Sequence, residues 1–291
     1  MSDLKILVTG AGGQLASELE HTLPDHVSAL FVSEQQLDIT DQNAVDRVTA
    51  DHKPDWIINA AAYTAVDKAE DEPEIAALVN AQGAANLATA AVKHSCRLVQ
   101  VSTDYVFDGL QPVAYTVDSE PNPLSVYGST KNDGDQQCLR ILGDQALVIR
   151  TSWVYSCTGH NFVKTILRLC REKPRLTIVD DQVGTPTWAR SLADMVWQAV
   201  GQELTGIWHF TDSGIASWYD FAVAIQDIGL ELGMLQQPIP ILPIHSQDYP
   251  QKARRPMFSV LDKSTTWQTL ESPPPHWRNA LKQMLTECKH V

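Results

Sequence analysis

The sequence predicts an α/β fold, a Rossmann-type doubly wound parallel sheet with a smaller, irregular C-terminal lobe. Short apolar runs alternate with longer amphipathic runs through the first half of the 291 residues, as in strands joined by crossover helices. A glycine-rich turn, VTGAGGQLA, follows the first apolar run and opens the first helical pattern. Beyond residue 237 prolines become dense, which is typical of irregular structure built against the ends of a sheet.

Five strands are expected in the first half, each a short apolar run of strand length. They cover residues 5–9, 28–32, 56–60, 97–102 and 146–152. The helices expected between them cover residues 15–23, 44–52, 73–94 and 126–142. Thr40 and Asp41 are cap candidates for the second helix, and Pro73 suits the first turn of the third. The fourth helix is expected despite Gly134.

After about Thr151 the pattern changes. Four further helices are expected, over residues 162–172, 191–200, 218–232 and 277–288, with strand-like runs at 176–179 and 206–210. The triple proline at residues 273–275 predicts a bent connector before the last helix. We therefore divide the chain into a dinucleotide-binding Rossmann domain, residues 1–151, and a mainly substrate-binding lobe, residues 152–291, whose chain returns to the core sheet.

Composition excludes several classes of function. The net charge is −13, from 22 basic and 35 acidic residues, and this acidity argues against a nucleic-acid or membrane-surface role. No window approaches the roughly 20 apolar residues of a membrane span, and no signal peptide is recognisable. The five cysteines are odd in number and lack C-x-x-C spacing, so we expect reduced, mostly buried thiols in a cytoplasmic protein.

The glycine turn indicates a dinucleotide site. Gly10 and Gly13 lie between the first strand and first helix, where backbone N–H groups can approach a pyrophosphate that the helix dipole also favours. The spacing is G-x-x-G-x-x-A, and Ala16 stands where a third glycine often allows close packing. The glycines could simply form a tight turn, but their position between a strand and a helix favours cofactor binding.

Tyr127 and Lys131 are four residues apart and share one face of a helix. An ammonium near a phenol favours phenolate, so we expect Lys131 to lower the pKa of Tyr127 toward working pH, as a general acid for ketone reduction requires. The lysine can also donate to nicotinamide ribose hydroxyls. The same spacing is common in surface pairs, and that interpretation remains open for this motif taken alone.

Two further segments favour catalysis over a surface pair. Ser102 and Thr103 end the fourth strand, where a hydroxyl can bind the substrate carbonyl beside Tyr127. Small residues, Ala60 to Ala62, end the third strand, where a dinucleotide could lie close to the backbone. Together with the glycine turn these segments predict one cleft.

The sequence resembles the extended short-chain dehydrogenase/reductase superfamily and, within it, the dTDP-4-dehydrorhamnose reductase family. The resemblance rests on TGAGGQL, LDITD, NAAAYTAVDKAE, STDYVFDG, YGSTK, RTSWVY, NFVKTILRL, DQVGTPT and ARRP, which span about residues 6 to 256. It implies that Tyr127 is the proton donor, Lys131 its partner and Thr103 the third catalytic group. The positions that match cofactor contacts are Gly13, Gln14, Leu15, Asp38, Ile39, Ala62, Tyr63 and Thr64, and those that match substrate contacts are Thr103, Asp104 and Trp153.

The implied reaction is reduction of dTDP-4-dehydro-6-deoxy-L-mannose at C4 to dTDP-L-rhamnose, for a cell-surface polysaccharide such as lipopolysaccharide O-antigen. NADPH and NADH both stay open, because Ser33 could tolerate a 2′-phosphate, Glu34 could reject one and no arginine stands there. Trp153 could pack on the hexose or thymine, or be a core tryptophan. Arg254 and Arg255 could meet the diphosphate or pair with acidic side chains.

The chain departs from the family pattern at one place. Some members dimerise around a magnesium ion, and Glu18 matches one ligand position. The partner position is Arg190, which cannot bind the ion, so we expect no metal. A homodimer through other contacts stays open.

Related activities are the main alternatives. The 4,6-dehydratases of this superfamily carry Asp-Glu after the catalytic threonine, whereas Asp104 and Tyr105 follow Thr103 here, and epimerases are usually longer. A different nucleotide-4-keto-6-deoxyhexose reductase is harder to exclude. A non-catalytic regulatory subunit, resembling that of methionine adenosyltransferase, is the alternative from another class.

Overall fold

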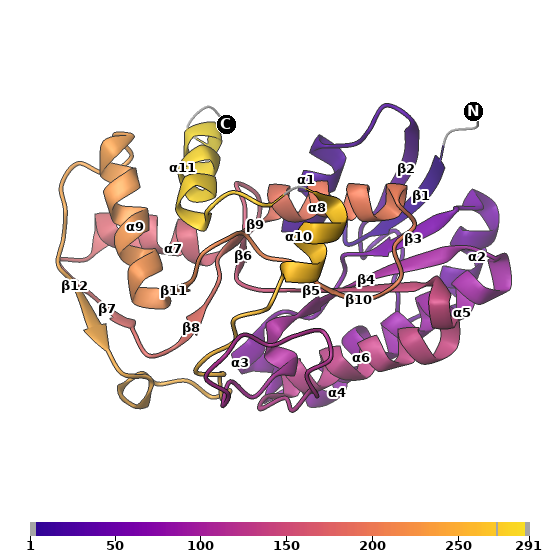
Figure 1. Cartoon of the computed structure of the whole chain (residues 1–291), viewed down its shortest axis with the longest axis horizontal. Coiled ribbons are helices and arrows are strands. Elements are labelled where there is room, and N and C mark those ends of the chain that lie inside the picture. Colours follow the sequence, from indigo (N-terminus) through magenta and orange to yellow (C-terminus); the bar gives the residue numbers. More distant parts are fainter. Residues whose placement is uncertain (1–3, 272, 289–291) are drawn as a thin grey trace.

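A six-stranded parallel sheet forms the centre of the molecule, with strand order β10-β5-β4-β3-β1-β2. The structure is a computed structural model that describes residues 4–271 and 273–288. The strands are β1 (Leu4–Thr9), β2 (Val27–Val32), β3 (Trp56–Asn59), β4 (Arg97–Thr103), β5 (Ala146–Thr151) and β10 (Gly206–His209). The expected doubly wound parallel sheet is confirmed (Figure 1).

Helices cover both faces of this sheet (Figure 1). One face is covered by α1 (Gln14–His21) and α8 (Ala189–Gly201), which pack against each other. The opposite face is covered by α2 (Gln42–His52), α5 (Ala84–His94) and α6 (Val126–Leu142). Asp41 caps α2 by accepting from the backbone N–H groups of Asn43 and Ala44, whereas Thr40 bonds to Asp38 instead.

The long helix expected over residues 73–94 is interrupted by a π-helical turn. It comprises α4 (Pro73–Ala77), the π turn η1 (Leu78–Gly83) and α5. Within the turn, Asn80 accepts from the backbone N–H of Tyr63 at 2.9 Å and donates to its carbonyl at 3.1 Å. The irregular turn thus fixes the loop that follows β3, and such π turns are frequent near functional sites.

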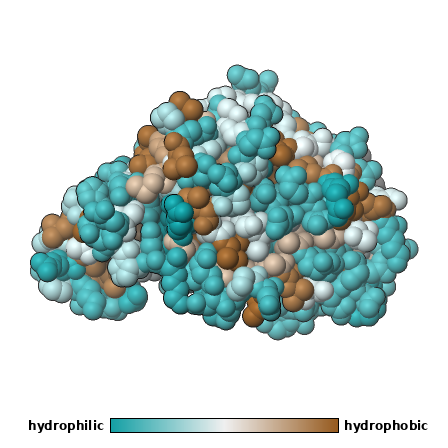
Figure 2. Space-filling view, turned by 90° about the horizontal axis from the view of Figure 1, so that it is seen from below, coloured by the Kyte–Doolittle hydropathy of each residue, from teal (hydrophilic) through white to brown (hydrophobic). Residues whose placement is uncertain are grey.

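The same helix corrects one expectation from composition. By length and composition alone, the 22 residues Pro73–His94 could cross a membrane, so the statement that no window approaches a span is wrong. In the structure more than half of its apolar window is buried, and the helix packs against α6 and α2 as a core element. The molecular face seen from below is mostly hydrophilic, with hydrophobic residues in separate groups (Figure 2).

Helix α6 lies unusually close to its neighbour because of a glycine. A Cβ on Gly134 would come within 2.2 Å of the carbonyl oxygen of Asn80, so only glycine allows this approach. Ser125 caps the helix by accepting from the N–H of Gly128 at 3.1 Å. The cap and the close packing fix the turn that carries Tyr127.

Apart from α8 and β10, which belong to the central sheet and its core, most of the chain beyond Thr151 forms a second hydrophobic core and short two-stranded sheets. Its helices are α7 (Phe162–Glu172), α9 (Trp218–Glu231) and α11 (Trp277–Cys288), and its strand pairs are β6 (Val154–Tyr155) with β9 (Thr187–Trp188), β7 (Leu176–Val179) with β12 (Ile241–Ile244), and β8 (Val183–Gly184) with β11 (Ala216–Ser217). Short elements complete the chain: α3 (Val66–Ala69), η2 (Asp104–Val106), η3 (Gly143–Gln145), η4 (Ser246–Asp248) and α10 (Ser264–Leu270). The ends of the two predicted domain ranges, residues 1–3 and 289–291, lie outside the described residues.

The cysteines differ from expectation at one pair. Cys96, Cys138 and Cys170 are free and buried, as expected. Cys157 and Cys288 form a disulfide across 131 residues of sequence, so the expectation of reduced thiols is wrong for these two. The bond ties the last described turn of α11 to the loop between β6 and α7.

Candidate active site

Two adjoining cavities lie at the carboxyl ends of β1, β3, β4 and β5. The larger, about 920 Å³, follows the glycine turn and the ends of β2 and β3. The smaller, about 270 Å³, lies over the ends of β4 and β5, and both cavities are lined by Gln14, Ala62 and Thr64. The residues predicted as catalytic, cofactor-contact or substrate-contact all line one or both of them: Gly10, Gly13, Gln14, Leu15, Asp38, Ile39, Ala62, Tyr63, Thr64, Thr103, Asp104, Tyr127, Lys131 and Trp153.

The glycine turn brings the chain close to β3. Gly10 has φ +79°, and a Cβ there would lie 2.8 Å from the carbonyl carbon of Ala60. Gly13 precedes the first turn of α1 and has no side chain, so it provides no side-chain cap for the N–H groups of that turn. Such a helix start can bind a pyrophosphate through its backbone.

The far end of the larger cavity is lined by the residues that follow β2. Ser33, Glu34, Asp38 and Ile39 all lie there. Asp38 accepts from the N–H of Thr40 at 2.8 Å and from its hydroxyl at 2.7 Å. These bonds hold the Asp38 carboxylate in place at the cavity wall.

Tyr127 lies in the smaller cavity beside the end of β4. Its ring meets that of Tyr105 edge to face, with centroids 5.6 Å apart. Burial raises the pKa of Tyr127 to about 12. A hydrogen bond with Thr103 lowers this pKa, whereas the carboxylates of Asp104 and Asp135 raise it further. The expected lowering of the Tyr127 pKa by Lys131 is therefore wrong for the protein alone, because desolvation of the phenol dominates. At neutral pH Tyr127 carries its proton, which is the form a proton donor needs.

Lys131 is buried behind Tyr127, with 3% of its surface exposed. Its ammonium donates to the carbonyl oxygen of Val101 at 2.6 Å. Burial lowers the pKa of Lys131, whereas Asp135 and Cys138 raise it. The ammonium is thus directed along β4, and it lines the same cavity as Tyr127.

The two hydroxyls at the end of β4 have different partners. Ser102 donates to the carboxylate of Asp135, so its hydroxyl is turned toward α6. Thr103 donates to Asp104 at 3.2 Å and accepts from the N–H of Tyr105 at 3.2 Å. Of the two, Thr103 is the one that contacts Tyr127.

A C-terminal segment, residues 251–259, packs against Asp104 and Asp67 beside the smaller cavity. The Ser259 hydroxyl donates to Asp104, a carboxylate whose pKa burial raises to about 7. Arg255 binds Asp67 through both terminal nitrogens, at 3.0 and 2.7 Å, and Arg254 is exposed. Neither arginine lines the cavities, and Arg255 takes the alternative of pairing with an acidic residue.

Trp153 lines the same cavity as the catalytic candidates. Its backbone has φ +47°, which is strained for a bulky residue and is often found at functional sites. Its ring stacks on Trp218, the first residue of α9, with centroids 3.5 Å apart. Trp218 was not predicted from the sequence, because no local spacing marks it.

Two more residues missed by the sequence analysis lie in the larger cavity. Gly159 and His160 come from the loop that contains Cys157. Asn161, at the end of this loop, donates to the side-chain oxygen of Gln14 at 3.0 Å. The disulfide-linked loop is therefore part of the cavity wall.

Comparison with known proteins agrees with this geometry. The family model described as RmlD substrate binding domain matches residues 4–290. The chain is 40% identical to the dTDP-4-dehydrorhamnose reductase of Aggregatibacter actinomycetemcomitans, covering 96% of this chain and 98% of the relative. This chain belongs to the RmlD family of dTDP-4-dehydrorhamnose reductases.

Other relatives extend the comparison. The crystal structure of dTDP-4-dehydrorhamnose reductase from Bacillus anthracis in complex with NADP superposes with a TM-score of 0.93 at 33% identity, covering 98% of this chain and 99% of that one. A Streptomyces niveus relative named dTDP-4-keto-6-deoxy-D-glucose reductase is 36% identical, over 95% of both chains. The resemblance found from sequence motifs is confirmed, and the protein is an oxidoreductase of this family.

At the position where some family members are expected to bind magnesium, this chain has an ion pair. Arg190 binds Glu18 at 2.6 Å and Glu287 at 3.2 Å. Within residues 4–271 and 273–288, no three His, Cys, Asp or Glu side chains gather to hold a metal ion. The guanidinium supplies the positive charge that balances these carboxylates.

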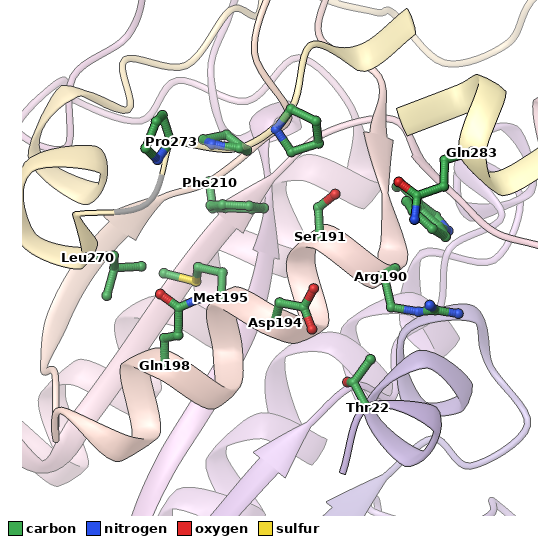
Figure 3. Close-up of a pocket in the computed structure, with 13 residues that line it drawn as sticks. Thr22, Arg190, Ser191, Asp194, Met195, Gln198, Phe210, Leu270, Pro273 and Gln283 are labelled. Carbon is green, nitrogen blue, oxygen red and sulfur yellow. The ribbon is translucent and has the colours of Figure 1, made fainter. Parts of the chain in front are cut away.

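A separate hollow of about 470 Å³ lies near this ion pair, between α8 and the proline connector. Ser191 points from α8 toward the connector, whereas Arg190 extends away from it (Figure 3). None of the predicted site residues lines this hollow. We therefore place the candidate active site in the two adjoining cavities.

Proposed function

We propose that the protein reduces the C4 ketone of dTDP-4-dehydro-6-deoxy-L-mannose to dTDP-L-rhamnose with NADPH or NADH. The observation that carries the proposal is that Tyr127, Lys131 and Thr103 lie in a cavity that adjoins the glycine turn. The names of the relatives support the substrate class.

The larger cavity fits a nicotinamide dinucleotide. The close approach at Gly10 and the uncapped first turn of α1 leave backbone N–H groups for a pyrophosphate. Gln14, Leu15, Ala62, Tyr63 and Thr64 would line the cofactor between this turn and Tyr127, and Asp38 and Ile39 would flank the adenosine end. When bound, the nicotinamide supplies hydride.

Tyr127 would supply the proton. Because its pKa is raised, the phenol is protonated at neutral pH and can neutralise the alkoxide that develops at C4. Thr103, hydrogen-bonded with Tyr127, would hold the same oxygen in position. Lys131 would bind the ribose hydroxyls and keep a positive charge near the phenol. Asp104 and Trp153 would contact the sugar.

The test is the loss of nicotinamide absorbance with enzymatically prepared substrate, for wild type and Tyr127→Phe. We expect the variant to lose about 10²–10⁴-fold in kcat, as is typical when a general acid is removed. Tyr249→Phe, an exposed tyrosine away from the cavities, is the matched control. A Tyr127→Phe variant with wild-type turnover contradicts the assigned proton donor, and no turnover by folded wild type contradicts the reaction.

A second candidate is reduction of a different 4-keto-6-deoxyhexose. The Streptomyces niveus relative, named for a D-glucose-series substrate, is the observation that favours it. Parallel assays with the L-mannose-series and D-glucose-series ketosugars, with NMR of each product, separate the two, because reduction sets only the configuration at C4 and the other ring centres come from the substrate.

A cytoplasmic location and a homodimer are also part of the proposal. The acidic composition and the biosynthetic relatives support the location, whereas the Cys157–Cys288 disulfide is unusual for that compartment. Counting free thiols in protein trapped directly from cells tests the first point. Sedimentation of the purified protein tests the second.

A further inference from the structure

A cluster of buried charges lies beneath the candidate catalytic residues. Asp135 follows Lys131 by one helical turn on α6 and is fully buried, and Arg150 on β5 is 1% exposed. An Asp135 carboxylate oxygen lies 4.0 Å from Nε of Arg150. Buried charges are stable only when they are paired, so these three side chains depend on one another.

Asp135 is the carboxylate that balances the charge of Arg150. Its guanidinium lies over the ring of Phe107 at 5.1 Å, and Nε and Nη1 have no hydrogen-bond partner among the described residues. His209, its register partner on β10, is neutral, because burial lowers the pKa of this histidine to about 3. Asp135 is therefore the negative charge that balances Arg150 within the part of the chain the structure describes.

Asp135 and Lys131 are both fastened to β4. Ser102 donates to Asp135, and the Lys131 ammonium donates to Val101. The next residue of the strand is Thr103, which contacts Tyr127. The end of β4 thus links these two buried side chains to the position where substrate is proposed to bind.

We infer that Asp135 is a positioning residue, whose carboxylate, held by Arg150 and Ser102, keeps Lys131 cationic and aligned along β4 behind Tyr127. The inference rests on the proposed roles of Tyr127 and Lys131. It assigns a function to a carboxylate that touches neither cavity.

The electrostatics agree with this role. Burial lowers the pKa of Lys131, and Asp135 is the largest influence that raises it, followed by Cys138. Burial raises the pKa of Asp135 to about 6, opposed by Lys131, Ser102 and Arg150. The charges of Asp104 and Asp135 also raise the pKa of Tyr127, to which burial contributes most. Removing the Asp135 charge therefore lowers the Lys131 pKa further, so that the lysine loses its proton at a lower pH.

The test is Asp135→Asn, with Asp133→Asn as the matched control, because Asp133 lies on the same helix and is exposed. We would measure kcat/KM against pH, dinucleotide affinity against pH by calorimetry, and thermal unfolding. In Asp135→Asn we expect the basic limb of both profiles to move down by about one pH unit, a roughly tenfold loss at a fixed pH on that limb. We expect the control to superpose on wild type.

A folded Asp135→Asn protein with wild-type pH profiles overturns the inference. If this variant does not fold, Ser102→Ala removes the bond that holds Asp135 without removing its charge, and a smaller shift in the same direction is expected. An unshifted profile in folded Ser102→Ala then overturns the inference. If wild type binds the dinucleotide but reduces no ketosugar, the proposed function fails, and the pH dependence of binding still tests Asp135.

Discussion

Trp218 stacks flat on Trp153, with ring centroids 3.5 Å apart and the planes inclined by only 8°. The first ring begins α9 in the second core, and the second follows β5 of the parallel sheet. Gly184 allows the contact, because a Cβ there would lie 2.8 Å from the Trp153 ring. The stack forms a wall of the smaller cavity from both parts of the chain.

Replacing Trp218 should weaken substrate binding more than it slows chemistry. In Trp218→Leu, Trp153 loses its stacking partner, and we expect KM for the ketosugar to rise about three- to tenfold with kcat changed less. Trp208→Leu makes the same change on β10, outside both cavities, and should leave KM as in wild type. Steady-state kinetics with both variants check this, and equal KM values for the two contradict a role for the stack.

The Cys157–Cys288 disulfide predicts how many free thiols the protein contains. Protein purified without reductant and denatured should show three free thiols, Cys96, Cys138 and Cys170, and reduction should reveal two more. Because the bond closes a loop of 131 residues, Cys288→Ser should lower the free energy of unfolding by about 2–4 kcal/mol. Cys170→Ser, at a free cysteine, should leave the two-thiol difference intact. Five thiols in the unreduced protein would show that the pair stays open.

Two glycines of the cofactor turn should differ in their effect on binding. Both Gly10 and Gly12 have positive φ, +79° and +86°, so alanine strains the backbone at either position. Only at Gly10 would the new Cβ meet Ala60, since nothing lies within 4 Å at Gly12. We expect Gly10→Ala to weaken dinucleotide binding at least about tenfold more than Gly12→Ala, measured by fluorescence titration. Similar losses in both variants would mean that backbone strain, not the contact with β3, controls the site.

Buried Asp212 should make the protein less stable as pH rises. Burial raises its pKa to about 7, so the folded state holds a proton that the unfolded state releases near the ordinary value of 3.8. Between about pH 4 and pH 7 the folded state therefore binds more protons, and stability falls with increasing pH. Asp104 changes the stability with pH in the same direction, because burial also raises its pKa to about 7.

The measurement is the midpoint of thermal unfolding of Asp212→Asn between about pH 4 and pH 7. We expect a shallower fall than in wild type, because one of the buried protons no longer contributes. Exposed Asp118→Asn serves as the control and should keep the wild-type slope. An unchanged slope in Asp212→Asn would show that its carboxyl does not retain a proton in the fold.

The sequence pattern was sufficient to predict most of the sheet, and it selected catalytic candidates that the structure brings into one cavity. Strand-length apolar runs located β1 to β5, because strands buried on both faces are continuously hydrophobic. Tyr127 and Lys131 could be paired by helical spacing, and Thr103 could be placed by its position at a strand end. These features depend on residues near one another in sequence.

Features that depend on tertiary contacts could not be found in this way. The disulfide joins residues 131 positions apart, and Trp218 reaches the cavity only because α9 packs under Trp153. The Tyr127 pKa was predicted in the wrong direction, because helical spacing shows the nearby lysine but not how completely the phenol is desolvated. The π turn at η1 likewise follows from packing against α6, which local propensity does not reveal.

The C-terminal segment, residues 251–259, is synthesised after the whole parallel sheet. All six strands of the parallel sheet precede it, ending with β10 at His209. A chain emerging from the ribosome can therefore complete the sheet and the glycine turn while Asp104 and Asp67 still lack Ser259 and Arg255. The contacts of this segment with Asp104 and Asp67 are therefore added only in the last stage of synthesis, after the glycine turn and the whole parallel sheet have been made.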